Sequence, residues 1–105
     1  MNFDRQNCIT ACQLCYIDCR SCLVAMAGKP SDNDCPNCCL QCMDACLTCI
    51  NALVGNAMHT KEYCLLCSEV CQWCAQQCGE HGHEHCKVCA ASCLVCAKAC
   101  RSMAG

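Results

Sequence analysis

Cysteine takes the positions at which a helix of a bundle normally carries leucine. In the segment EYCLLCSEVCQWCAQQC, Glu62 to Cys78, successive cysteines are separated by steps of 3, 4, 3 and 4 residues. Steps of three and four residues bring side chains onto one face of an α-helix. The segment is therefore predicted to be a helix whose buried stripe is made of thiols.

The same spacing occurs four times along the chain. Each of the four stripes holds five cysteines, so twenty of the 21 cysteines lie on a stripe and Cys38 is left beside the second. The stripes comprise Cys8, Cys12, Cys15, Cys19 and Cys22; Cys35, Cys39, Cys42, Cys46 and Cys49; Cys64, Cys67, Cys71, Cys74 and Cys78; and Cys86, Cys89, Cys93, Cys96 and Cys100. Four such faces turned toward one another would line a tube with thiols.

Glycines separate the periodic segments. Gly28, Gly55 and Gly79 each follow a stripe, as a glycine at a helix C-terminus does. The breaks predict four helices, at about 4–27, 34–54, 60–79 and 83–102. Their short connections favour antiparallel neighbours. We predict an all-α, up-down-up-down antiparallel four-helix bundle with a cysteine-lined core, formed by residues 1–105 as a single domain.

Polar residues and proline mark the expected helix starts. Asp34 is the candidate cap of the second helix, and Pro36 is expected in that helix's first turn. Thr60 is the candidate cap of the third helix.

Charge and composition exclude several classes of partner. The formal net charge is −2, which argues against nucleic acid. Purely apolar runs are only a few residues long, so we expect no membrane partner. The first residues carry no apolar leader, which points to the cytoplasm, where thiols stay reduced. No catalytic triad, phosphate loop or carboxylate pair stands out, so we expect no enzyme.

Two purely structural explanations for the thiols, hydrophobic packing and disulfide bonding, are poorly supported. Cysteine is much smaller than leucine, and each missing methylene forfeits about 0.8 kcal/mol of burial, so thiol packing alone would leave the core underfilled. Disulfides along one helix would be strained, because Cβ atoms at i and i+4 lie about 5–6 Å apart and a disulfide needs about 3.8 Å. Disulfides between helices are geometrically possible, but the odd cysteine count and the absence of an export signal disfavour them.

Metal binding remains, and the spacing favours Cu(I). Two sulfurs that hold one Cu(I) ion linearly lie roughly 4.5 Å apart, taking the metal–sulfur length of zinc sites, and thiols at i and i+4 can meet this. Soft thiolates favour Cu(I), and one Cu(I) neutralises one thiolate. A Zn(II) ion in a four-cysteine site leaves a charge of −2, and iron–sulfur clusters carry similar excess charge, which is costly to bury. The ligands are then the stripe cysteines, with Cys38 as an additional candidate.

At this point the chain resembles the bacterial copper storage proteins, in their cytosolic branch. The resemblance rests on four consecutive helices that carry Cys-x-x-x-Cys pairs, such as CITAC, CYIDC, CMDAC and CSEVC. It implies a four-helix bundle that holds many Cu(I) ions on inward thiolates, and a homotetramer. The alternatives are a Zn(II)-binding, metallothionein-like protein and a copper chaperone, although a chaperone usually needs one exposed cysteine pair.

Histidines and apolar rows suggest further contacts. His81, His83 and His85 lie in the predicted loop between helices three and four, and we expect them to form a metal entry port. Met58 and His59, at the opposite end, are weaker candidates. Second apolar rows beside the stripes predict a homo-oligomer with Trp73 near an interface. These rows comprise Ile9, Tyr16 and Leu23; Leu40 and Leu47; Leu66 and Trp73; and Val88 and Val95.

Overall fold

Four long helices make up nearly all of the protein. The computed structural model describes residues 3–104. The helices are α1 (Phe3–Met26), α2 (Asn37–Gly55), α3 (Thr60–Gly79) and α4 (Glu84–Ala104). The all-α class and the four segments predicted from the cysteine spacing are confirmed.

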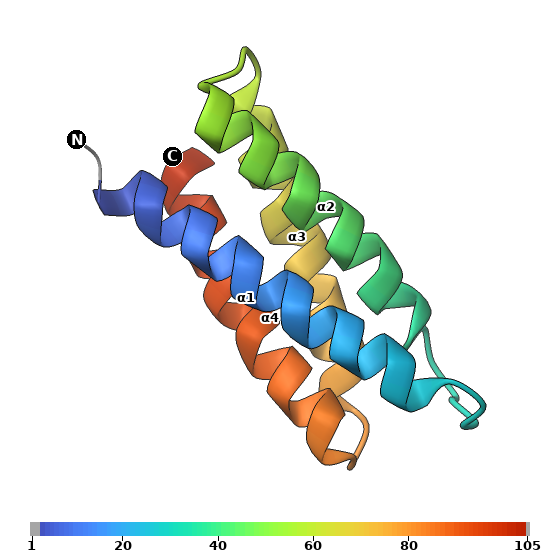
Figure 1. The fold of residues 1–105 in the computed structure, drawn as a ribbon. Coiled ribbons are helices and arrows are strands. Elements are labelled where there is room, and N and C mark those ends of the chain that lie inside the picture. The colour runs from blue at the N-terminus through green and yellow to red at the C-terminus, as the bar shows by residue number, and fades with distance from the viewer. Residues whose placement is uncertain (1–2, 105) are drawn as a thin grey trace.

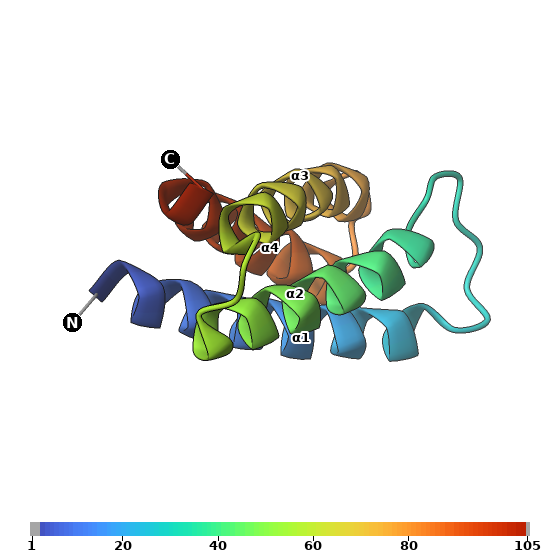
Figure 2. The same ribbon diagram turned by 90° about the horizontal axis from the view of Figure 1, so that it is seen from above.

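The helices form an antiparallel bundle in which each helix contacts the two that flank it (Figure 1). Seen from above, α1 and α2 form one layer and α3 and α4 the other (Figure 2). The 27–36 and 80–83 connections lie at one end of the bundle, which we call the loop end. Both termini and the 56–59 connection lie at the other, which we call the terminal end. The up-down-up-down topology is therefore confirmed.

The prediction that a glycine follows the end of a helix is confirmed at one of three positions. Gly28 follows α1 with φ of 79°, a left-handed conformation that glycine adopts without a steric penalty. Gly55 and Gly79 are instead the last residues of α2 and α3. After α2 the left-handed residue is Asn56, with φ of 49°, and its N–H reaches carbonyls of the last turn.

The predicted start of α2 is wrong by one turn. The helix begins at Asn37, so Asp34 does not cap it and Pro36 precedes it rather than lying in its first turn. Asp34 contributes its main chain instead: its carbonyl accepts from Cys38 N at 2.8 Å, and its N–H donates to Gln77 Oε1 at 2.9 Å. The turn is thus tied to α3 and not closed by a side-chain cap.

Thr60 is not a cap either, because it is the first residue of α3. His59 holds the capping position in a left-handed conformation, with φ of 69°. The Thr60 hydroxyl donates back to the carbonyls of Ala57 and Ala52. These bonds fasten the 56–59 connection to α2, and no side-chain hydrogen bond caps α3.

The second apolar rows divide into two kinds. Ile9, Tyr16, Leu23 and Trp73 are half-buried and pack against the thiol core. The others stay exposed, by 44–62%, and comprise Leu40, Leu47, Leu66, Val88 and Val95. The bundle therefore covers one row on α1 and leaves apolar side chains on the outer faces of α2, α3 and α4.

Two helices, α1 and α2, are long and apolar enough to cross a membrane by length and composition alone. Core helices of bundles and leader sequences pass the same test, so it is weak evidence for a span. Cysteines provide much of this apolar character, and they face the bundle interior. The expectation of no membrane partner stays a prediction.

Candidate metal centre

Every cysteine of the chain is buried, and every one is a free thiol. All 21 lie within the described residues, with relative exposure of 0–1%. The bundle interior is therefore a continuous body of sulfur, with a few apolar side chains around it. The expectation of a disulfide-free, inward-facing thiol core agrees with this arrangement.

The thiols are stacked in five layers, each of which takes one cysteine from each of the four chain segments. From the loop end to the terminal end, the layers comprise Cys22, Cys35, Cys78 and Cys86; Cys19, Cys39, Cys74 and Cys89; Cys15, Cys42, Cys71 and Cys93; Cys12, Cys46, Cys67 and Cys96; and Cys8, Cys49, Cys64 and Cys100. The alternating steps of three and four keep each helix in register with these layers.

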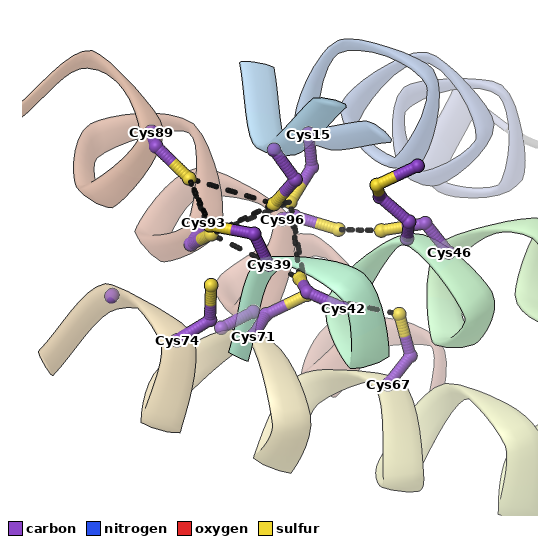
Figure 3. Close-up of a cluster of buried hydrophobic side chains, with 14 of the residues drawn as sticks. Cys15, Cys39, Cys42, Cys46, Cys67, Cys71, Cys74, Cys89, Cys93 and Cys96 are labelled. Atoms are coloured by element: carbon purple, nitrogen blue, oxygen red, sulfur yellow. Dashed lines mark hydrogen bonds between the residues drawn. The ribbon is translucent and has the colours of Figure 1, made fainter. Parts of the chain in front are cut away.

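Within a layer the sulfurs are in contact. In the central layer, Cys15 Sγ lies 3.6 Å from both Cys42 Sγ and Cys93 Sγ. Cys42 Sγ lies 3.4 Å from Cys71 Sγ. Figure 3 shows these side chains projecting from separate helices toward one another. Several sets of four sulfurs lie within 4.8 Å of one another, a spacing that suits a shared metal ion.

Contacts along each helix join neighbouring layers. Sγ atoms at i and i+4 are 3.8 Å apart for Cys67 and Cys71 and 3.9 Å apart for Cys89 and Cys93. With metal–sulfur bonds of about 2.3 Å, sulfurs lie about 4.0 Å apart around a three-coordinate ion and about 4.5 Å apart across a linear one. The observed spacing is therefore closer to three-coordinate than to linear, and linear sites need small rotamer changes.

No side-chain cation lies among the thiols in residues 3–104, so their charge state depends on what they bind. Burial raises the pKa of Cys64 to about 11. Burial likewise raises the pKa of Cys86. These two thiols are protonated at neutral pH, and a metal that binds them as thiolates must displace their protons.

The three predicted histidines gather at the loop end. Their rings stack in a row, with His83 centred 6.2 Å from His81 and 5.1 Å from His85. Lys29 Nζ lies 3.5 Å from His85 Nε2, and His85 Nδ1 lies 3.5 Å from Cys86 Sγ. An ammonium can only donate, so Nε2 accepts and the ring proton lies on Nδ1, facing the sulfur. The row thus leads from the surface to the first thiol layer.

Asn33 fixes the 27–36 connection over this end. Its Nδ2 donates to Gln77 O at 2.8 Å and to Glu80 Oε1 at 2.7 Å. Its Oδ1 accepts from Cys35 N at 2.9 Å and from His81 Nε2 at 3.0 Å. The acceptor role of this amide leaves Nδ1 of His81 as the ring atom with a lone pair.

The terminal end offers less. Leu53 is buried beside the last layer, with an exposure of 1%. Met58 is 81% exposed, and His59 Nδ1 lies at the surface, 3.9 Å from Glu62 Oε1. Neither candidate ligand contacts a thiol among the described contacts. Met26 and Met43 pack in the core, as expected.

Two features of the site escaped the sequence pattern. Cys35 keeps its place in the first layer but lies in the turn before α2, because the helix starts later than predicted. Lys29 and Asn33 had no signal beyond their position in a polar turn, since their partners lie about fifty residues away in the sequence.

Comparison with known proteins fits this geometry. A family model described as copper storage protein matches residues 1–105. An uncharacterised cysteine-rich protein, YhjQ of Bacillus subtilis, is 35% identical over 93% of this chain and 87% of its own length.

Two solved structures share the fold. Apo copper storage protein 3 from Bacillus subtilis is 35% identical, covering 95% of this chain and 98% of that one, with a TM-score of 0.90. The Cu(I)-bound copper storage protein BsCsp3 is 33% identical, covering 97% and 99%, with a TM-score of 0.92. The match over the whole length, together with the layered thiols, shows that this chain belongs to the copper storage protein family.

Proposed function

We propose that this chain stores Cu(I) in the cytoplasm, with the ions distributed among the thiolates of the five layers. The observation that carries the proposal is the stack itself, in which several sets of four buried sulfurs, within a layer or across two neighbouring layers, lie close enough to share an ion. The proposed ligands are the twenty layer cysteines together with Cys38. The cytoplasm suits this role because its reductants keep thiols free.

Charge decides between Cu(I) and the zinc alternative. We call the five stacked layers the column. Filling the column with about one Cu(I) per thiolate gives a neutral interior. A Zn(II) ion in each layer would instead bury a net charge of about −10 in a core without lysine or arginine. The chaperone alternative is also disfavoured. A docking chaperone presents an accessible cysteine pair, and here all 21 thiols are buried. We further propose that residues 1–105 act as one domain, because the layers draw on all four helices.

Copper enters, on this proposal, at the loop end. The imidazoles of His81, His83 and His85 provide neutral nitrogen ligands on the way to Cys86. At the terminal end, Met58 and His59 are exposed, and neither contacts a thiol among the described contacts. Ions would then pass between layers by exchange of neighbouring thiolates.

We also propose a homo-oligomer, as the family resemblance implies, and most simply a tetramer. Leu14, Ile17 and Leu47 line an exposed apolar groove between α1 and α2. Exposed apolar surface of this kind marks contacts between subunits. Trp73, half-buried on α3, is proposed to lie near such an interface.

The oligomer is tested by light scattering coupled to size exclusion. The chain should elute as a multiple of its 11.4 kDa mass. I17E places a charge in the groove and should lower the mass, while the exposed control H59A should not. A wild-type monomer at micromolar concentration contradicts the assembly.

High capacity is expected because each thiol can be neutralised by one ion. Titrated without oxygen against a Cu(I) chelator, the reduced protein should take up about one Cu(I) per thiol at saturation. C15S should lower the capacity by about one ion, since the remaining layers are intact. Saturation of the wild type at about five ions would contradict storage.

Copper binding should weaken as the pH falls. The raised pKa of Cys64, about 11, means that its proton must leave when copper binds. Below that pKa, each Cu(I) that displaces one proton should bind about tenfold more weakly per pH unit. Competition titrations at pH 8 and pH 6, corrected for the chelator's own protonation, measure this. A pH-independent affinity would show that the thiols are already ionised.

Replacing the three histidines should slow copper entry without changing capacity. In H81A/H83A/H85A, the rate of Cu(I) uptake from a chelator should fall several-fold, because the row of nitrogen ligands is lost. The matched control is H59A, at the terminal end. Stopped-flow absorbance measures the uptake rate separately from the capacity. Equal uptake rates in the triple variant and the wild type would show that these histidines have no role in copper entry.

A further inference from the structure

Cys38 lies outside the five layers, next to cysteines of the first two layers at the loop end. The sequence CPNCC places Cys35 in the turn before α2, and Cys38 and Cys39 in the first turn of that helix. Facing them is Cys78, in the last turn of α3. Three of the four thiols therefore come from five consecutive residues, and all four lie at the loop end.

The sulfurs of the other three cysteines lie around Cys78 Sγ. Cys78 Sγ lies 3.7 Å from Cys35 Sγ and 3.8 Å from Cys38 Sγ. It lies 3.6 Å from Cys39 Sγ.

The Cys-x-x-Cys pattern at a turn and the distances from Cys78 Sγ suit a four-thiolate site for a divalent ion. Two cysteines separated by two residues at a turn, completed by sulfurs from another element, are typical ligands of Zn²⁺. Around a tetrahedral ion with metal–sulfur bonds of about 2.3 Å, neighbouring sulfurs lie about 3.8 Å apart. We propose that Cys35, Cys38, Cys39 and Cys78 bind one divalent thiophilic ion of the Zn²⁺ class while the column is empty of copper.

The charge of such a site is easier to accommodate here than in the column. A divalent ion with four thiolates carries −2, and inside the stack that charge is surrounded only by further thiols. At the loop end, the Lys29 ammonium lies on the rim, 3.5 Å from His85. The N-terminus of α2, which favours negative charge, lies at Cys38 and Cys39. Cys35, held in a turn, can also shift without moving a helix.

The site overlaps the path of copper. Cys35 and Cys78 belong to the first layer and Cys39 to the second, so the divalent ion occupies thiols that copper later uses. Incoming Cu(I) replaces it by ligand exchange: the four thiolates are retained, the divalent ion leaves, and Cu(I) ions take its place without any oxidation or reduction. The loop end is then a metal-exchange site as well as an entrance.

Co²⁺ is a suitable probe, because four-thiolate Co²⁺ absorbs strongly and is displaced by Zn²⁺. The reduced, copper-free protein should bind a first equivalent of Co²⁺ with a four-thiolate spectrum, and one equivalent of Zn²⁺ should abolish it. C38S and C35S should each bind Co²⁺ at least about tenfold more weakly, with an altered spectrum. C64S, which removes a thiol at the terminal end, is the matched control and should keep the wild-type spectrum and affinity.

Circular dichroism of each variant confirms that the helices are retained. Equal losses in C38S and C64S, or no four-thiolate Co²⁺ spectrum in the wild type, overturn the proposal. Copper storage is judged separately, by Cu(I) titration of the wild type, so a failure of the divalent site leaves storage standing and the reverse also holds.

Discussion

Contact between sulfurs across the four helices is the constraint on which the rest of the structure depends. Each helix alternates steps of three and four, so its thiols meet those of three other segments at five levels. Cysteine is too small to fill this interior as leucine does. The core therefore consists of sulfurs 3.4–4.0 Å apart and not of large interdigitated side chains. The same shortfall in volume that weakens apolar packing provides room for metal ions.

The cysteine spacing predicted the helices, the bundle and the burial of the thiols, because one periodicity determines all three. It could not predict the start of α2, where main-chain bonds of Asp34 to α3 and to Cys38 replace a side-chain cap. Nor could it place Asn33 or Lys29 at the loop end, since their partners depend on how two connections meet in space. Local sequence patterns predict individual helices, whereas the structure of the two bundle ends depends on tertiary contacts.

The two ends of the column differ in chemistry although the column itself is nearly uniform. At the terminal end, Leu53 is buried and the nearby His59 lies at the surface, 3.9 Å from Glu62. At the loop end, polar side chains hold a long connection in place beside the row of histidines and the first thiol layer. A bundle with equivalent layers thus acquires a direction from its loops alone.

Because each layer takes one cysteine from every chain segment, an ion bound within a layer joins helices that are distant in sequence. Bound ions then act as cross-links, and ligands that bind only the folded state stabilise it in proportion to their occupancy. Chains loaded with copper would unfold rarely, and chains without copper would unfold more often. A cell's proteases, which act on opened chains, would therefore remove empty stores first, so that the lifetime of each molecule records how much metal it carries.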